Sequence, residues 1–309
     1  MPGTINNTAE ILNRPPRSPT QDAIRALFRT KSAIAGMVVL FLLVLTAIFA
    51  PVIAPYDPTM VLIGIEKVKK REPPCIHLLG CPADHPQHIL GTDGNVRDFF
   101  SRVVYGSRVS LFIGFATVGF AIVIGTLLGT LAGYMGRSSD NIIMRFMDVL
   151  LAFPALLLAI AIVTVLGEGL TNALLAIGIV SIPTYARVSR ASVLSIKEQD
   201  YIMAARAVGV QPSRILTRGI LPHVLTPLIV AGTLGIATAI LDAAALSFLG
   251  LGAQPPMAEW GSMLGAERNQ VFTAPHLVFF PGFAIMLTVL AFNLLGDGLR
   301  DALDPRLRK

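Results

Sequence analysis

The sequence contains 309 residues, of which 53% are hydrophobic and only 14% are charged, and its mean hydropathy is +0.67. A soluble domain usually carries about 25% charged residues, so this composition excludes an ordinary soluble protein and predicts a chain embedded in membrane lipid. The net charge of +6 accompanies no basic module interleaved with aromatic residues, so no nucleic-acid partner is expected.

Six apolar segments are predicted to cross the membrane, because a hydrocarbon core about 30 Å thick requires about 20 apolar residues per helix. The fold class is therefore all-α and integral to the membrane, with six transmembrane helices. An N-terminal tail of residues 1–31 precedes the first transmembrane helix, which is placed at residues 32–54. The apolar segments themselves are residues 33–53, 110–134, 149–166, 170–185, 225–246 and 277–296.

Glycine residues mark two further features of the predicted bundle. Gly167 and Gly169 enclose Glu168 between the third and fourth spans, a pattern typical of a tight hairpin at one membrane surface. In the second span, glycines recur every four to six residues, a spacing that lets neighbouring helices approach closely. These glycines are Gly114, Gly119, Gly125, Gly129 and Gly133.

The distribution of basic residues predicts the orientation of the chain. Of the 25 Lys and Arg residues, 17 lie in loops on the side of the N-terminus and 8 on the other side. Basic loops stay in the cytoplasm, so both termini are expected there, including a C-terminal tail of residues 299–309. Residues 55–109 form the predicted extracytoplasmic loop, and the rule is weakest for this loop because its length approaches about 60 residues.

This loop contains a group of residues with metal-ligand chemistry, whose spacing matches no standard zinc pattern. Five residues separate Cys75 from Cys81, which allows a disulfide in an oxidising compartment. Three alternatives stay open: a disulfide, two unpaired thiols, or a metal site, to which we assign no ligands. The group consists of Cys75, His77, Cys81, His85 and His88.

Residues 200–223 are predicted to form a helix, a turn and a second helix on the cytoplasmic side. Asp200 can cap the first helix, and alanines within residues 204–207 favour it. Gly209 lies where a left-handed residue would end that helix, and Pro212 can open the second. Pro222 interrupts the chain again as the fifth span begins, so a short element is held between two membrane helices.

Within this segment, A-A-x-x-x-G followed by L-P resembles the EAA loop of ABC importer permeases, the coupling element that fits a cleft in the ATPase. The family usually has glutamate where this chain has Met203, so the resemblance does not imply a charged contact there. It implies that the ATPase-coupling residues are Met203, Ala204, Ala205, Gly209, Leu221 and Pro222.

Further stretches resemble the C-type subunit of the peptide-transporter branch of this family. They include H-I-L-G-T-D, L-S-F-L-G-L-G-A-Q-P-P, E-W-G-S-M-L and L-L-G-D-G-L-R-D-A-L-D-P-R-L. After the G-T-D element the family usually has L-G-R-D, whereas this chain has G-N-V-R-D at residues 94–98, so the detailed shape of the loop is left open. The resemblance implies the type I ABC importer fold, with a five-helix core at residues 110–298 and a coupling loop at residues 188–223.

The resemblance also implies the partners and the substrate. The chain would pair with a homologous permease, two ATPase subunits that bind ATP and Mg, and an extracytoplasmic substrate-binding protein, in a bacterial or archaeal cytoplasmic membrane. It has no G-x-x-x-x-G-K-[ST] stretch, so we expect neither a cofactor nor an enzymatic activity in this chain. Dipeptides or oligopeptides are the implied substrates, and nickel, opines and oligosaccharides are the alternatives within the branch.

Two groups of polar residues leave their roles open. Asp242 lies within an apolar span, where a carboxylate normally faces a cavity or a partner, so it is a candidate for lining the pore. Asp93, Arg97, Asp98 and Arg102 either bond to one another in a surface loop or, by analogy with the family, help to dock the binding protein.

Two other classes of protein are weighed against the permease. A membrane metalloenzyme using the Cys/His loop would be expected to carry a pattern such as H-E-x-x-H, which is absent from the sequence. An ATP-independent secondary carrier would be expected to show inverted repeats and paired charges within its spans, whereas Asp242 stands alone in its span.

Overall fold

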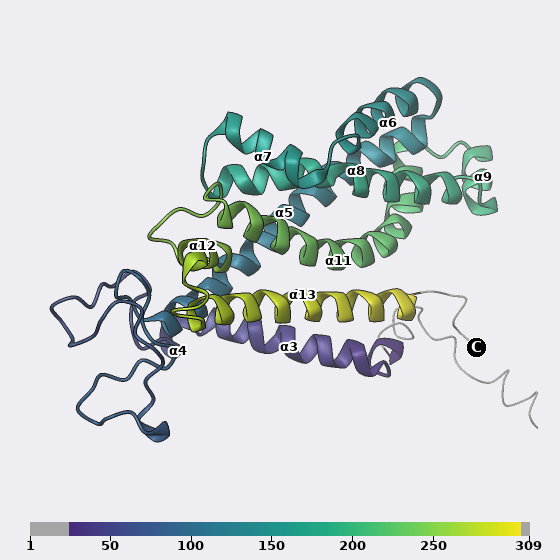
Figure 1. Cartoon of the computed structure of the whole chain (residues 1–309). Coiled ribbons are helices and arrows are strands. Elements are labelled where there is room, and N and C mark those ends of the chain that lie inside the picture. Colours follow the sequence, from purple (N-terminus) through teal and green to yellow (C-terminus); the bar gives the residue numbers. More distant parts are fainter. Residues whose placement is uncertain (1–24, 304–309) are drawn as a thin grey trace, which may run out of the picture.

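A computed structural model describes residues 25–303, so the predicted tails lie largely outside the described residues, at 1–24 and 304–309. Over residues 25–303 the regular secondary structure consists of helices, with three isolated β-bridges in the loop of residues 54–98. The long helices run side by side (Figure 1). We call the end of the bundle that carries the 54–98 loop the loop end, and the opposite end, which carries helix α9, the α9 end.

Most predicted spans correspond to single helices, which confirms the all-α class. Four helical segments are long and apolar enough to cross a membrane: α3 (Lys31–Ile48), α5 (Phe99–Met135), Pro212–Phe248 and α13 (His276–Leu303). The fourth predicted span is α8 (Leu170–Ile196), which falls outside this group although its 27 residues would extend about 40 Å. The hairpin before α8 is confirmed, because Gly167 and Gly169 both have positive φ angles and α8 begins at the next residue.

The third predicted span, residues 149–166, is not one helix. Helix α6 (Arg137–Leu151) and helix α7 (Ala155–Leu166) meet at an angle of 92° across a break of three residues. Pro154 lies in that break and cannot donate a backbone hydrogen bond, so the helix ends before it. The 12 residues of α7 extend only about 18 Å, so the span is either broken or re-entrant.

Helix α5 begins 11 residues before the predicted start at residue 110, because its N-terminus has a strong cap. The Asp98 carboxylate accepts a hydrogen bond of 2.7 Å from the backbone N–H of Ser101. One turn later, Arg102 donates to the carbonyl oxygens of Pro58 (2.8 Å) and Pro256 (3.2 Å). Residues assigned to the loop from their charge are therefore helical, and the loop ends at Asp98 instead of residue 109.

The glycine spacing in α5 produces the expected close helix packing. A Cβ atom added at Gly125 would lie 2.9 Å from the carbonyl oxygen of Ile182 in α8, and one at Gly129 would overlap the carbonyl oxygen of Ala186. Gly133 continues the same stripe towards Val193. Gly119, by contrast, has open space beside it, so the stripe that packs on α8 is confirmed for part of the predicted set.

The linker between α11 (Leu221–Phe248) and α13 folds into a short helix, α12 (Trp260–Glu267), at the loop end. Trp260 is buried, and its Nε1–H donates to the carbonyl oxygen of Val103 at 2.9 Å. A Cβ atom at Gly106 would lie 2.7 Å from the indole ring. The Trp260 side chain therefore packs inside the protein and is not available as an anchor at a membrane interface.

Candidate functional sites

At the α9 end, helix α9 (Asp200–Ala207) ends in the left-handed turn that its sequence predicts. Gly209 has a φ angle of +76° and donates its N–H to the carbonyl oxygen of Arg206. The next N–H, that of Val210, reaches back to the carbonyl oxygen of Ala205 at 3.0 Å. These two bonds form a Schellman motif. No atom would touch a Cβ at Gly209, so the backbone conformation alone favours glycine here.

The outer face of α9 presents apolar side chains together with the charged residues Asp200 and Arg206. Met203 is 47% exposed and Val208 is 78% exposed, and Ala204 between them is also exposed. The opposite face packs inward, because Ile202 is buried and the Tyr201 hydroxyl donates to the carbonyl oxygen of Gly219 at 3.0 Å. Nonpolar surface at a chain's exposed end is typical of a docking site for another protein.

Ala205 and Asp200 differ from their predicted settings. Ala205 is half-buried and packs against the hydrophobic core, whereas Ala204 and Ala207 are exposed. Asp200 lies in the first turn of α9, and Gln199 occupies the N-cap position without a side-chain cap bond. The carboxylate of Asp200 is thus placed to favour the helix through its dipole instead of a cap.

The second half of the loop is continuous with the fifth span. Pro212 opens helix α10 (Pro212–Arg214), as predicted, and a π-helix (Ile215–Ile220) joins it to α11 without a break. The N–H of Leu221 donates to the carbonyl oxygen of Leu216, five residues earlier. This wider turn accommodates Pro222, which has no N–H, so the predicted interruption at Pro222 is a change of helix type and not a break.

At the loop end, His88 joins two carboxylates of the 54–98 loop. Its Nδ1 lies 2.8 Å from Asp98 and its Nε2 lies 3.0 Å from Glu66. Burial lowers the pKa of His88, but hydrogen bonds and the charges of Asp98 and Glu66 outweigh burial and raise the pKa overall. Tyr56 stacks on the imidazole and donates to Glu66, and burial together with that bond raises the pKa of Tyr56 to about 12.

We expect the stability of the 54–98 loop to fall as the pH rises. Because the folded pKa of His88 is raised above the ordinary value of about 6.5, its stabilisation is fully present below that value and is lost as the pH rises through the raised pKa. A neutral imidazole donates only one hydrogen bond, so one of the two carboxylates loses its hydrogen bond from His88.

Hydrogen exchange of the loop checks this expectation. The exchange rates, corrected for their intrinsic pH dependence, are measured over the same pH series in the unaltered protein and in the His88→Gln variant. The variant should lose the pH dependence. An equal slope in both proteins would contradict the assignment to His88.

The G-T-D segment is held together by its own charges. Arg97 Nε lies 2.7 Å from Asp93 Oδ2, and Arg102 Nε lies 3.4 Å from the same oxygen. All three side chains are buried. The expectation that these residues help to dock a partner is therefore not supported by their positions, and the alternative of a self-bonded loop is the one observed.

Val96 lies in the segment that departs from the family pattern L-G-R-D, and it has a backbone conformation that favours glycine. Its φ angle is +57°, which costs a residue with a side chain about 1–2 kcal/mol. Its side chain is buried, and complete burial of a valine contributes roughly 1.5–3 kcal/mol. Burial therefore offsets the backbone cost and explains how the chain tolerates valine here.

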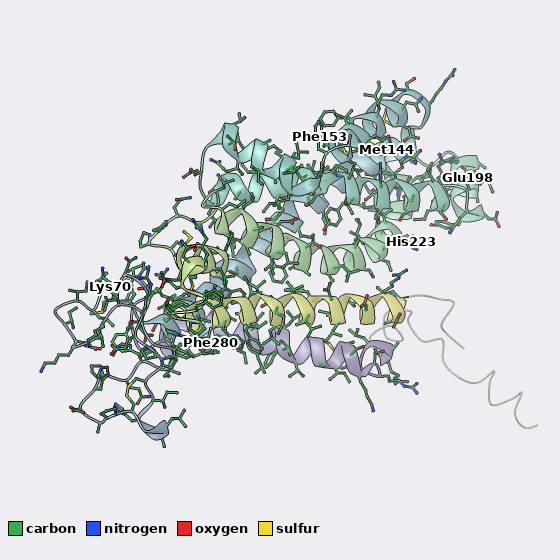
Figure 2. The ribbon with its side chains drawn as sticks, viewed as in Figure 1. Lys70, Met144, Phe153, Glu198, His223 and Phe280 are labelled. Carbon is green, nitrogen blue, oxygen red and sulfur yellow. A yellow bond between two sulfur atoms is a disulfide. The ribbon has the colours of Figure 1, made fainter. Side chains whose placement is uncertain are left out.

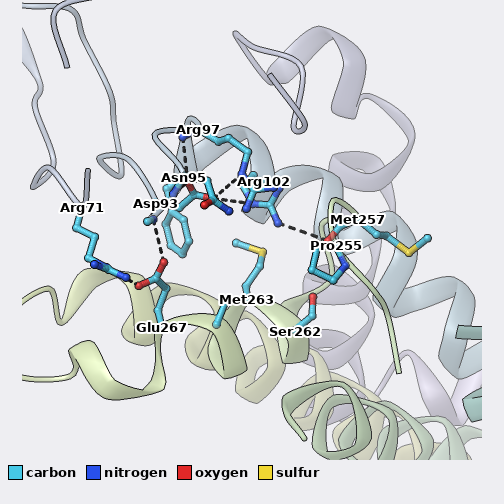
Figure 3. Close-up of a pocket in the computed structure, with 13 residues that line it drawn as sticks. Arg71, Asp93, Asn95, Arg97, Arg102, Pro255, Met257, Ser262, Met263 and Glu267 are labelled. Atoms are coloured by element: carbon cyan, nitrogen blue, oxygen red, sulfur yellow. Dashed lines mark hydrogen bonds and ion pairs between the residues drawn. The ribbon is translucent and has the colours of Figure 1, made fainter. Parts of the chain in front are cut away.

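Glu267 in α12 ties the loop to the helical bundle. One carboxylate oxygen accepts from Arg71 Nε at 2.8 Å, and the other accepts from the backbone N–H of Gly94 at 2.9 Å. These contacts border a cavity of about 190 Å³ between the loop and α12 (Figure 3). No local sequence pattern reveals the role of Glu267, because its partner Arg71 lies 196 residues away.

A second buried glutamate, Glu259, caps α12. Its carboxylate accepts from the N–H groups of Gly261 (2.9 Å) and Ser262 (2.8 Å). Burial raises the pKa of Glu259, although these hydrogen bonds lower it in part. Its role is structural, because it fixes the start of the helix that carries Trp260 and Glu267.

Cys75 and Cys81 form a disulfide, with their Cα atoms 5.4 Å apart. His85 adjoins them, with Nδ1 3.7 Å from the Cys75 sulfur and Nε2 3.2 Å from Glu72. While the sulfurs are bonded, neither can serve as a thiolate ligand for a metal. We expect non-reducing mass spectrometry to find the two cysteines joined, and alkylation of both thiols without reductant would contradict this expectation.

Asp242 lies in α11 and is half-buried. Among residues 25–303, no hydrogen bond or ion pair involves its side chain. Its position within an apolar helix leaves the carboxylate to be satisfied by water or by another chain.

Comparisons with known proteins agree on one family. The model for the inner membrane component of binding-protein-dependent transport systems matches residues 125–309, and the model for the N-terminal transmembrane domain of oligopeptide transport permease C matches residues 18–74. A dipeptide transport system permease of Alkalihalophilus pseudofirmus is 49% identical over 94% of this chain and 91% of its own. A di/tripeptide permease of Pseudomonas aeruginosa is 45% identical over 94% of this chain and 93% of its own.

Two further comparisons extend this result. A glutathione transport system permease of Pectobacterium atrosepticum is 44% identical over 94% of this chain and 93% of its own. Among solved structures, an inward-facing form of the MetNI methionine ABC transporter superimposes with a TM-score of 0.55 at 20% identity, covering 66% of this chain and 96% of that one. At that identity the structural likeness concerns the fold alone.

Proposed function

The chain belongs to the family of inner membrane components of binding-protein-dependent transport systems, and from this premise we propose that it forms half of a dipeptide path in an ATP-driven importer. A homologous permease would supply the other half, and separate subunits would bind ATP and Mg. The structural observation that carries the coupling role is the α9 turn, where Gly209 orients an exposed, small-residue helix face.

The α9 surface supports a role in contacting an ATPase. Of the six proposed coupling residues, Met203 and Ala204 are exposed, and Ala205 is half-buried beneath them. The other three shape the turn and the start of the following helix: Gly209, Leu221 and Pro222. The uncharged Met203 and Ala204 side chains allow a partner's cleft to pack on this face, and the exposed Arg206 lies one turn from Met203.

The proposed orientation places the α9 end in the cytoplasm and the loop end outside. The disulfide at Cys75 and Cys81 supports it, because disulfides persist in oxidising compartments. Reporters fused after Asp84 or Glu168 should lie outside, and those fused after Arg137 or Gly209 should lie inside. A cytoplasmic reporter at Asp84 would overturn this orientation.

Dipeptides are the proposed substrate because of the names of two similar relatives. One is named a dipeptide permease, and the other is named a di/tripeptide permease. Glutathione, itself a tripeptide, is the second candidate, since a glutathione permease is nearly as similar. Purified importer in proteoliposomes, supplied with its binding protein, should take up labelled dipeptide only with ATP. Uptake of glutathione, nickel, an opine or an oligosaccharide in place of dipeptide would reassign the substrate.

We also propose that Asp242 faces the path between the two permeases. Its half-buried carboxylate has no side-chain partner among the described residues, which a water-filled path would explain. Asp242→Asn should change the affinity for charged dipeptides while leaving assembly intact. Equal uptake of all dipeptides by both proteins would place Asp242 outside the path.

A further inference from the structure

The 54–98 loop carries a group of exposed cations at the loop end of the molecule. Lys67, Lys69 and Lys70 are all exposed, and we call these three residues the basic rim. Arg71 follows directly and is partly exposed, even though its guanidinium contacts Glu267. Figure 2 shows Lys70 in the loop that extends beyond the helix ends, at the opposite end of the molecule from His223 and Glu198.

The acidic residues of the same loop are largely turned away from solvent. Two carboxylates, Asp57 and Asp84, remain exposed. The other four lie within 3.2 Å of a nitrogen of a histidine or arginine side chain: Glu66, Glu72, Asp93 and Asp98. Four of the loop's six carboxylates are therefore held by partners within the protein, and the three exposed lysines outnumber the two exposed carboxylates.

The basic rim lies over the helical bundle and not beside it. Arg71, next to Lys70, binds Glu267 of α12, and α12 packs against both α11 and α13. Arg71 holds this position with a φ angle of +58°, an uncommon conformation for a residue with a side chain. The segment is thus fixed where a protein seated on the end of the bundle would meet it.

Building on the proposed function, we propose that the basic rim binds an acidic surface of the extracytoplasmic substrate-binding protein. Complementary charges accelerate the encounter of two proteins and select the partner, and their effect weakens as salt screens them. A lipid surface is the less favoured occupant, because the neighbouring Arg71–Glu267 contact anchors the rim to α12 above the bundle.

The test uses the complete importer in lipid nanodiscs and, as the probe, the labelled binding protein that supports dipeptide uptake by the unaltered importer. The variant Lys67→Glu/Lys69→Glu/Lys70→Glu reverses the rim, and Lys67→Arg/Lys69→Arg/Lys70→Arg keeps its charge as the matched control. At low salt the reversed variant should bind the probe at least about tenfold more weakly, mainly through slower association. The arginine variant should bind as the unaltered importer does, and high salt should narrow the difference.

The basal ATPase rate without binding protein should be the same in all three proteins, which shows that the variants are assembled. Equal affinity of the unaltered and reversed importers for the probe would overturn the inference. The inference would also be overturned if the reversed variant bound the probe normally and lost only its binding to vesicles rich in anionic lipid. That result would assign the rim to the membrane. If the unaltered importer shows no uptake that depends on a binding protein, the proposed function fails instead.

Discussion

Replacing Gly129 by leucine should prevent the subunit from accumulating as a folded membrane protein. A side chain there would overlap the carbonyl oxygen of Ala186, so α5 and α8 would have to separate along their shared stripe. Overpacking a well-packed core typically costs about 1–3 kcal/mol, and a clash with backbone cannot be relieved by a rotamer change. In lipid this loss is severe, because close packing itself drives helix association.

Gly119→Leu is the matched control for Gly129→Leu, since it places the same side chain on the same helix where no atom lies within 4 Å. We expect Gly119→Leu to accumulate normally and Gly129→Leu to fall several-fold in the yield of detergent-extracted, monodisperse protein. Equal yields of the two variants would show that the α5–α8 contact does not determine folding.

The bundle could be predicted from the sequence because membrane helices satisfy their own backbone groups, so apolar length alone reveals them. The positions of Gly125 and Gly129 indicated close packing without naming the partner helix. Hydropathy does not predict the break at Pro154, because residues 149–166 are largely apolar on both sides of the bend. A proline in that segment was the available signal.

The loop end could not be predicted, because its order depends on contacts between distant residues. Asp98 both caps α5 and forms an ion pair with His88. Glu267 binds Arg71, which lies 196 residues earlier in the sequence. A basic residue such as Arg102 is typical of an exposed loop, yet Arg102 is buried and its guanidinium donates to backbone carbonyl oxygens. Charge alone therefore does not decide where a helix begins.

The α9 turn could be predicted almost to the residue, because a left-handed helix end is a local property. Gly209 has the expected conformation, and the residues before it form the helix. Which alanine faces outward depends on how α9 packs on the segment around Gly219, and the sequence does not contain that orientation in any local pattern. Ala204 is the residue to change when the outer face is tested.

Gly209→Val should abolish most ATP-dependent uptake while leaving the membrane bundle assembled. The left-handed conformation at φ +76° costs a residue with a side chain about 1–2 kcal/mol, which lowers the population of the native turn roughly 5- to 30-fold. The cost arises from the backbone, because no atom would touch the new Cβ. Gly209→Asn is the matched control, since asparagine tolerates this conformation better than valine.

Ala204→Asp should give the same loss of uptake by a different route, because it places a charge on the outer face of α9 without disturbing the turn. A carboxylate buried there by an ATPase would lack a partner, and removing its water is costly. Met203→Glu restores the residue usual in the family and should be tolerated, so it controls for charge on this surface as such.

Uptake, expression and ATPase co-purification measured together separate these explanations. Gly209→Val and Ala204→Asp should express normally, lose the ATPase during purification and transport at least about tenfold more slowly, a loss that corresponds to about 1.4 kcal/mol. Gly209→Asn should retain most of the uptake, because it differs from valine mainly in its tolerance of the turn. Wild-type rates in both Gly209→Val and Ala204→Asp would mean that α9 is not the coupling element, since one variant alters its orientation and the other its contact surface.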